Sequence, residues 1–243
     1  VGYAGRLPRP TGASVPVLSA MSPPPAPVLV IGNKNYSSWS LRPWLLLKQL
    51  GIAFTEVRLP LDTPQFVTEI GRWSPSGRVP VLRHGALTVW DSLAIAEYAN
   101  DVLAPGRVWP ASVEARAVAR SVAAEMHSGF MALRSELPMN VRARRRVAPS
   151  AACIADIDRL QGLIRDCRAR HGADGPWLFG AFSAADAMLA PVASRFATYD
   201  VPTDAAVGAW QASVLGCPAM REWSAAAAAE TEIVAADEAG EPV

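Results

Sequence analysis

The sequence predicts two domains in succession, an α/β domain over residues 27–104 and an all-α helical bundle over residues 111–227. Three observations predict this division. Runs typical of strands occur only in the first half, and after Pro110 apolar residues recur at steps of three and four, as on one face of a helix. Between the two patterns lies a segment with proline and glycine, residues 105–110, which we interpret as the linker.

The first domain follows the order βαβαββα. A β-branched run at 28–31, closed by Gly32, is typical of a buried strand. Helical spacing over 41–50 then ends at Gly51, a residue favoured just after a helix. An alternating strand, a short helix, a hairpin and a further helix are predicted at 54–59, 63–70, 79–89 and 91–103.

The second domain carries only helical patterns. An apolar stripe predicts one long helix over about 111–137, and a second stripe predicts another over 154–167. Residues 184–196 are apolar nearly all round, as expected of a helix in the middle of a bundle. Two shorter helices are predicted at 205–215 and 218–223.

The two ends of the sequence differ from the rest in composition. Residues 1–26 are rich in Pro, Gly and Ser, and we interpret them as a disordered or spurious N-terminal extension, with Met21 as the alternative first residue. Residues 228–243 are acidic and are predicted to form a flexible tail.

Composition argues against several classes of function. The 23 Lys+Arg and 22 Asp+Glu give a net charge of +1, which offers no electrostatic reason to bind nucleic acid or an anionic membrane. A run of about 18 uncharged apolar residues, as a transmembrane helix requires, is absent from the sequence. The 3 cysteines include no CxxC and the 3 histidines have no ligand spacing, so we predict no metal site and a reducing, cytoplasmic location.

Three serines lie in the segment that joins the first strand to the first helix. In an α/β sheet, ligands gather beyond the carboxyl ends of the strands, where helix N-termini supply free N–H groups. Ser40 fits an N-cap, because Pro43 then falls in the first helical turn. Ser37 and Ser38 are left over and are available to donate a hydrogen bond to a ligand.

Val79-Pro80 and Asp91-Ser92 are further candidate binding elements. A cis bond at Val79-Pro80 would leave the Val79 main chain free to pair with a ligand, and an ordinary strand start is the alternative. Asp91 and Ser92 open a helix and are both good cap residues. They would also suit the two charged ends of an α-amino acid, with Ser92 near the carboxylate and Asp91 near the ammonium.

Ser183 and Asp186 begin the central apolar helix with the spacing of a capping box, in which aspartate replaces the usual glutamate. A carboxylate in so apolar a segment must be hydrogen-bonded, because burying it unpaired is costly. We therefore predict a structural role for both residues.

Four stretches, at 37–42, 74–82, 91–98 and 182–186, together resemble the soluble glutathione transferase superfamily. The first half is similar to its thioredoxin-like domain and the second half to its all-α domain. The resemblance implies a cytoplasmic, homodimeric detoxification enzyme that uses glutathione as co-substrate and needs no metal.

The resemblance also implies roles for individual residues. The Val79 main chain would pair with the cysteinyl part of glutathione across a cis Val79–Pro80 bond, Asp91 and Ser92 would hold the γ-glutamyl end, and Arg78 would reach the glycyl carboxylate. Ser37 would donate a hydrogen bond to the sulfur and so favour the thiolate, which is the nucleophilic form of a thiol. Tyr36 and Ser38 are the alternatives for that task.

The second substrate implied is a small hydrophobic electrophile in a pocket that faces the helical domain. Met126, Phe130 and Met131 are candidates for its wall, with a core role as the alternative. The double serine resembles the zeta class, which includes maleylacetoacetate isomerases, but Trp39 stands where that class has a cysteine. Glutathione-dependent cis–trans isomerisation and non-catalytic ligand binding are the alternative functions.

Overall fold

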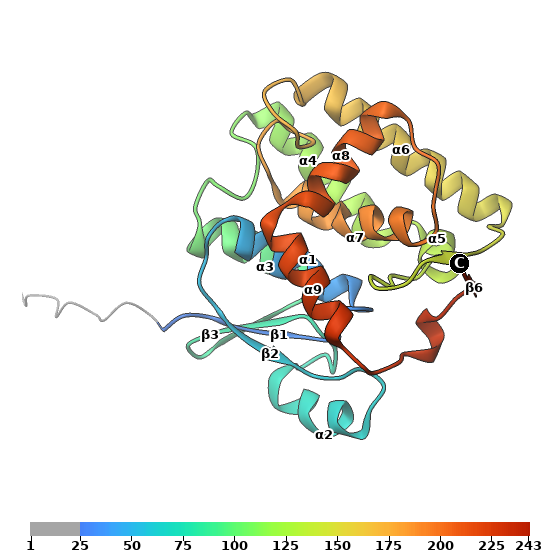
Figure 1. The fold of residues 1–243 in the computed structure, drawn as a ribbon. Coiled ribbons are helices and arrows are strands. Elements are labelled where there is room, and N and C mark those ends of the chain that lie inside the picture. The colour runs from blue at the N-terminus through green and yellow to red at the C-terminus, as the bar shows by residue number, and fades with distance from the viewer. Residues whose placement is uncertain (1–24) are drawn as a thin grey trace, which may run out of the picture.

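A computed structural model describes residues 25–243 and is drawn in Figure 1. The prediction of a disordered or spurious extension at 1–26 therefore lies almost entirely outside the described residues. Among residues 25–243, no helix is both long enough and apolar enough to cross a membrane.

The first domain has the predicted order of strands and helices. It comprises β1 (Val28–Ile31), α1 (Ser38–Gln49), β2 (Thr55–Arg58), α2 (Pro64–Trp73), β3 (Val81–His84), β4 (Leu87–Trp90) and α3 (Ser92–Tyr98), with a π-helical turn at Ala99–Leu103. Within the described residues the sheet order is β2-β1-β3-β4, and β1 is parallel to β2 but antiparallel to β3. This mixed sheet confirms the thioredoxin-like α/β prediction.

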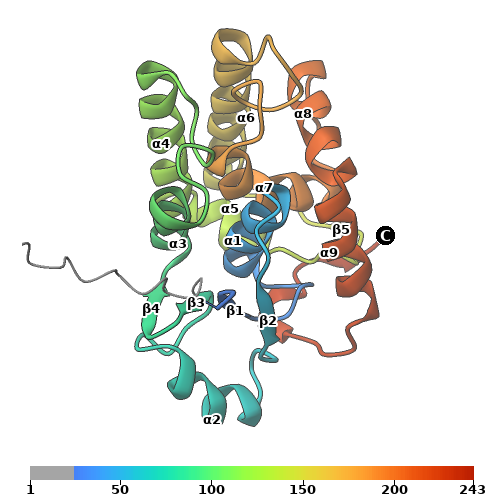
Figure 2. The ribbon, with the colours of Figure 1, turned by 90° about the vertical axis from the view of Figure 1, so that its left-hand side faces the viewer.

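The sheet separates two apolar layers because successive strand residues point to opposite faces. From β1, Leu29 and Ile31 join the large core that includes the helical domain. Val30 joins a small cluster with Ile70 of α2. Figure 2 shows α2 alone on one side of the sheet, with α1, α3 and the helical domain on the other.

The second domain is entirely helical apart from short pairings. It comprises α4 (Val113–Ser128), α5 (Met131–Glu136), α6 (Ala151–His171), α7 (Ala184–Thr198), α8 (Ala205–Gly216) and α9 (Pro218–Ala229). The central helix α7 is buried along nearly its whole length and packs against α1 of the first domain. The all-α prediction is thereby confirmed.

The prediction of one long helix over 111–137 is wrong, because the helix is interrupted between α4 and α5. Gly129 ends α4, and Phe130 adopts a left-handed conformation with φ 61° while its side chain stays buried. Glycine is a poor helix former, and burial of the Phe130 ring compensates for the unfavourable backbone. The break redirects the chain so that Arg134 of α5 donates to the carbonyl of Gly129 at 2.8 Å.

Ser183 and Asp186 form the predicted capping box at the start of α7. The Asp186 carboxylate is 0% exposed and accepts four hydrogen bonds, from the backbone N–H groups of Leu178 and Ser183, the Ser183 hydroxyl and the Trp210 indole. Burial raises the pKa of Asp186 to about 6, while these four donors act in the opposite direction. The Asp186 carboxyl is thus held inside the protein by hydrogen bonds to its own capping box, to Leu178 and to Trp210.

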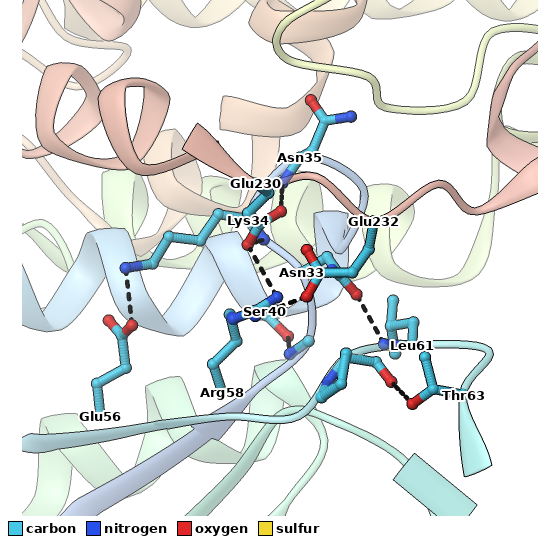
Figure 3. Close-up of polar contacts among 12 residues, drawn as sticks. Asn33, Lys34, Asn35, Ser40, Glu56, Arg58, Leu61, Thr63, Glu230 and Glu232 are labelled. Carbon is cyan, nitrogen blue, oxygen red and sulfur yellow. Dashed lines mark hydrogen bonds and ion pairs between the residues drawn. The ribbon is translucent and has the colours of Figure 1, made fainter. Parts of the chain in front are cut away.

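Residues 230–243 belong to the segment predicted as a flexible tail, 228–243, and they lie against both domains. The Glu230 carboxylate accepts the backbone N–H groups of Lys34 and Asn35 at 2.7 and 3.0 Å, as Figure 3 shows. Further along, β5 (Arg145–Arg146) pairs with β6 (Glu241–Pro242). The acidic composition that suggested solvation instead supplies partners for basic and N–H groups, including Arg145, which pairs with Glu238.

Candidate active site

Three segments of the first domain meet at one edge of the sheet and face the helical domain. They are the loop between β1 and α1, the turn before β3, and the start of α3. With residues of α4, α5 and α7 they line two cavities of about 440 and 380 Å³. Trp39, Arg78 and Val79 line both cavities, so the two adjoin.

The first cavity brings together the predicted binding residues of the first domain. Its lining comprises Trp39, Ser76, Arg78, Val79, Pro80, Trp90, Asp91, Ser92 and His127. The Val79–Pro80 bond is cis, as the resemblance implies. In the described part of the chain, neither the N–H nor the C=O of Val79 has a backbone hydrogen-bond partner outside the sheet and helices. The Val79 main chain is therefore available to a ligand.

The sequence left helix capping and ligand binding open as roles for Asp91 and Ser92, and in the structure only Asp91 caps the helix. Asp91 has φ 77° and caps α3, because its Oδ1 accepts the N–H of Leu93 at 2.8 Å. Its other oxygen, Oδ2, lies 3.5 Å from Nε2 of His127. Ser92 is 1% exposed, and its hydroxyl has no hydrogen-bond partner among residues 25–243. A buried hydroxyl in a native protein has a hydrogen-bond partner as a rule, and the Ser92 hydroxyl is free to take one from a molecule in the cavity.

Trp39 and His127 are site residues that sequence reasoning did not single out for this cavity. The Trp39 ring meets the imidazole of His127 edge-on at 5.3 Å between centroids. Its face is stacked by the guanidinium groups of Arg42 and Arg134, 4.1 and 4.7 Å from the ring centroid. His127 reaches the site only because α4 packs against the first domain, and the sequence carries no signal of that packing.

The second cavity contains the predicted sulfur-side residues. Its lining comprises Tyr36, Ser37, Ser38, Trp39, Leu61, Phe66, Gly77, Arg78, Val79, Arg134, Pro138, Met139, Arg195 and Asp237. Asp237 comes from the segment after α9, and Arg195 comes from α7. The cavity therefore combines an apolar wall with several charged groups.

The prediction that Ser40 caps the first helix is wrong. Helix α1 begins at Ser38, so Ser40 is not its N-cap; instead the Ser40 hydroxyl accepts the N–H of Gly32 at 3.0 Å. The Ser37 hydroxyl donates to Ser40 at 2.7 Å, and the Ser38 hydroxyl accepts from Arg195 at 3.4 Å. Both Ser37 and Ser38 line the second cavity.

The Tyr36 hydroxyl is occupied by other groups of the protein. It donates to Glu238 at 2.5 Å and accepts from Arg142 at 3.0 Å. The phenol is therefore held between a carboxylate and a guanidinium, with its proton engaged within the protein.

The predicted pocket wall is corrected. Met126 and Phe130 belong to the hydrophobic core, whereas Met131 is 68% exposed. None of the three is among the described residues that line either cavity.

Among the described residues, no cysteine lines either cavity. Cys153, Cys167 and Cys217 are buried and unpaired as free thiols. Burial raises the pKa of Cys153 and Cys167 to about 11 and also raises that of Cys217. Thiols with such pKa values are poor nucleophiles at neutral pH. Over the described ranges, no group of three or more His, Cys, Asp or Glu is arranged to hold a metal.

A thioredoxin-like domain followed by a helical domain, with cavities beside a cis-proline, defines the glutathione transferase class of fold. The family models agree: the "Glutathione S-transferase, N-terminal domain" matches residues 36–102, and the "Glutathione S-transferase, C-terminal domain" matches residues 116–226. The chain belongs to the glutathione S-transferase family. This confirms the family that the resemblance implied.

Curated relatives resemble part of the chain, and solved structures share its fold. It is 30% identical to maleylacetoacetate isomerase of Rattus norvegicus over 110 residues, which cover 45% of this chain and 51% of the rat protein. The chain thus matches only about half the length of that relative. A glutathione transferase homolog from Burkholderia, with bound glutathione, has a TM-score of 0.63 and 24% identity, covering 83% of this chain and 97% of the other. Maleyl pyruvate isomerase, described as a bacterial zeta-class enzyme, has a TM-score of 0.62 and 22% identity, with coverage of 83% and 97%.

Proposed function

We propose that the chain is a glutathione transferase in which the Ser37 hydroxyl stabilises the glutathione thiolate for attack on a small electrophile. One observation carries this proposal: Ser37 opens into the cavity that adjoins, through Val79, the cavity of the unpartnered Ser92 hydroxyl. A tripeptide can therefore lie across both cavities with its middle residue at Val79.

The first cavity suits the γ-glutamyl end of glutathione. The Ser92 hydroxyl and the N–H groups at the start of α3 would take the α-carboxylate, where the helix terminus favours negative charge. Asp91 keeps one carboxylate oxygen outside its cap bond, and this oxygen would take the ammonium. Arg78 lines both cavities and would bind the glycyl carboxylate.

Ser37 becomes a donor to sulfur when its bond to Ser40 reverses. Ser40 accepts the N–H of Gly32 and so retains its own hydroxyl proton. Rotation of the two hydroxyl hydrogens lets Ser40 donate to Ser37 and frees the Ser37 proton for the sulfur. A hydrogen bond to the charged form lowers the thiol pKa from its ordinary value of about 8.5.

The reaction that follows is nucleophilic substitution or addition. The thiol releases its proton to solvent, and the thiolate forms a carbon–sulfur bond with the electrophilic carbon. The displaced electron pair leaves with a leaving group or moves into a conjugated system, where a proton from water joins it.

Glutathione-dependent isomerisation is the second candidate function. The observation that favours it is the similarity to proteins named maleylacetoacetate isomerase, together with the double serine. In that reaction the thiolate adds to a conjugated double bond and later leaves, so glutathione is not consumed. Trp39 in place of a cysteine argues against it, and we rank it below conjugation. Non-catalytic ligand binding is the third candidate.

The experiment that tests the proposed function is calorimetric titration with glutathione, followed by turnover assays in which glutathione and product are both measured. Conjugation consumes one glutathione for each product formed, whereas isomerisation consumes none. Binding without turnover over a broad panel of electrophiles would instead support a ligand carrier. A homodimer and a cytoplasmic location stay predictions.

Replacing Ser92 with alanine is expected to weaken glutathione binding about 10-fold or more, because a hydrogen bond to a charged carboxylate is lost. The melting temperature should change little, since the hydroxyl has no partner among the described residues. Ser112→Ala is the matched control: Ser112 caps α4 by accepting the N–H of Ala115 at 3.1 Å. This control should lower stability and leave glutathione affinity unchanged, and equal affinities for Ser92→Ala and wild type would remove Ser92 from the site.

A further inference from the structure

The loop between β1 and α1 depends on a carboxylate that comes from the other end of the chain. We call this loop, residues 32–37, the serine loop. The backbone N–H groups of Lys34 and Asn35 both donate to the Glu230 carboxylate, at 2.7 and 3.0 Å, as Figure 3 shows. Lys34 is 9% exposed and Asn35 is 0% exposed, and buried N–H groups need an acceptor because leaving one unpaired is costly. Glu230 supplies the acceptor for both.

The Glu230 carboxylate is itself held in place from several sides. Its side chain is 7% exposed, and Nη1 of Arg58 lies 3.5 Å from Oε1. The Arg142 guanidinium donates to the Glu230 carbonyl. Glu230 directly follows α9, and Trp223 of that helix donates its indole N–H to the Lys34 carbonyl at 2.8 Å. Lys34 is therefore bound through both its N–H and its carbonyl to α9 and the residue after it.

Asn35 is fixed in addition by the segment between α5 and α6. Its Oδ1 accepts the N–H of Arg142 at 2.9 Å, its Nδ2 donates to Oδ1 of Asn140 at 2.8 Å, and its carbonyl accepts the N–H of Val141 at 3.2 Å. With the bond to Glu230, every polar group of Asn35 is engaged. The start of the serine loop is thus held by segments that lie far away in the sequence.

The position of Ser37 depends on this part of the backbone, because only one residue separates it from Asn35. Its N–H donates to the Asn33 carbonyl at 2.8 Å, and its hydroxyl lies in the lining of the second cavity. A displacement of about 1 Å in a reacting group can cost about 100-fold in rate. Glu230 is not among the described residues that line either cavity, so it can affect a bound thiol only through the loop.

We propose that Glu230 is a positioning residue, which fixes the Ser37 hydroxyl beside the glutathione sulfur by binding the N–H groups of Lys34 and Asn35. This inference rests on the proposed function, because Glu230 acts through Ser37. Two charge-assisted hydrogen bonds to one carboxylate set the orientation of this stretch of backbone as well as its position. Glu230 therefore raises the fraction of bound glutathione that is thiolate without touching the tripeptide.

The test is Glu230→Gln, which keeps the length of the side chain and replaces one acceptor oxygen by an NH2 group. That group cannot accept an N–H, so the loop loses one of its two bonds. We expect kcat for conjugation to fall about 10- to 100-fold, and the pKa of the bound thiol to rise toward the value of about 8.5 of a free thiol. KM for glutathione should stay near the wild-type value, because the predicted γ-glutamyl contacts lie in the first cavity.

Two further variants complete the comparison. Glu230→Asp restores two acceptor oxygens on a shorter side chain, and it should recover part of kcat and part of the shift in the thiol pKa. Glu232→Gln is the matched control: Glu232 pairs with Arg58 at 2.7 Å, whereas the two loop N–H groups are bound by Glu230. This control should keep the wild-type kcat and thiol pKa.

Combining Glu230→Gln with Ser37→Ala separates this inference from the proposed function. If Glu230 acts through Ser37, Glu230→Gln should have little further effect on the thiol pKa once the Ser37 hydroxyl is gone. Equal effects with and without that hydroxyl would overturn the inference and leave the role of Ser37 intact. A wild-type thiol pKa in Ser37→Ala alone would instead refute the proposed function, and this inference with it.

Hydrogen exchange at the amides of Lys34 and Asn35 measures the contact without any turnover. Exchange should be faster in Glu230→Gln than in the wild type and unchanged in Glu232→Gln, because only the first variant loosens the loop. Faster exchange together with a wild-type kcat and thiol pKa would show that the loop does not position Ser37, which contradicts the inference. If Glu230→Gln does not fold, the same comparison with Glu230→Asp decides the matter.

Discussion

Replacing Ser37 with alanine is expected to lower kcat/KM for glutathione conjugation about 100-fold, the usual scale for removing one donor to a developing or resting anion. The reason is that the thiol of bound glutathione loses the hydrogen bond that favours its ionised form, so less thiolate exists at neutral pH. The pH dependence of kcat/KM and the ultraviolet absorbance of the bound thiolate both report the shifted pKa. Glutathione affinity should change little, because the γ-glutamyl contacts lie in the other cavity.

Two variants serve as controls for Ser37→Ala. Ser38→Ala removes the adjacent hydroxyl, which accepts from Arg195 rather than donating to sulfur, and should keep the thiol pKa of the wild type. Tyr36→Phe removes a hydroxyl that is bonded to Glu238 and Arg142. If Tyr36→Phe abolishes turnover while Ser37→Ala retains it, the assignment of Ser37 is wrong.

Replacing Asp186 with alanine is expected to lower the free energy of unfolding at pH 7 by about 3–5 kcal/mol. The change leaves the N–H groups of Leu178 and Ser183 and the indole N–H of Trp210 without their acceptor inside the protein core. Urea denaturation measures the loss. Asp204→Ala is the control, because Asp204 also caps a helix, α8, but lies at the surface, so its loss should be clearly smaller.

The same carboxyl makes stability depend on pH. Its folded pKa of about 6 lies above its ordinary value of 3.8, so the folded state binds this proton more tightly than the unfolded state. The resulting stabilisation is fully present below about pH 4 and is lost as the pH rises through about 6. Asp186→Asn removes this contribution, so the stability difference between wild type and variant should change across that window. A difference that stays constant from pH 4 to pH 7 would contradict the raised pKa.

Short sequence motifs predicted those parts of the candidate site whose structure depends on residues close together in the chain. The strand run at Val28, the Val79-Pro80 dipeptide and the Asp91-Ser92 helix start each carry their structural information within a few residues, and each lies where expected. Ser37 was proposed on a similar local signal, since the loop contained more serines than one cap needs, and its role stays a prediction.

The parts that the sequence did not predict depend on packing between distant segments. Arg195 lies in a helix that looks wholly structural from its composition, and it reaches the cavity because α7 packs against α1. Met126, Phe130 and Met131 were candidates for the pocket wall with a core role as the alternative; Met126 and Phe130 pack in the core, and Met131 is exposed. Contacts of this kind leave no pattern in a single sequence.

The contact between Glu230 and the loop at Lys34 joins residues 196 positions apart. Loop closure over so long a separation is entropically expensive and contributes to slow folding, so we expect this contact to form late, after both domains have their helices and strands. Glu230 holds the N–H groups of Lys34 and Asn35, immediately before the serine loop. During biosynthesis, residues 34 and 35 therefore leave the ribosome long before the carboxylate that fixes them, and we expect catalytic competence to appear only after residue 230 has been made.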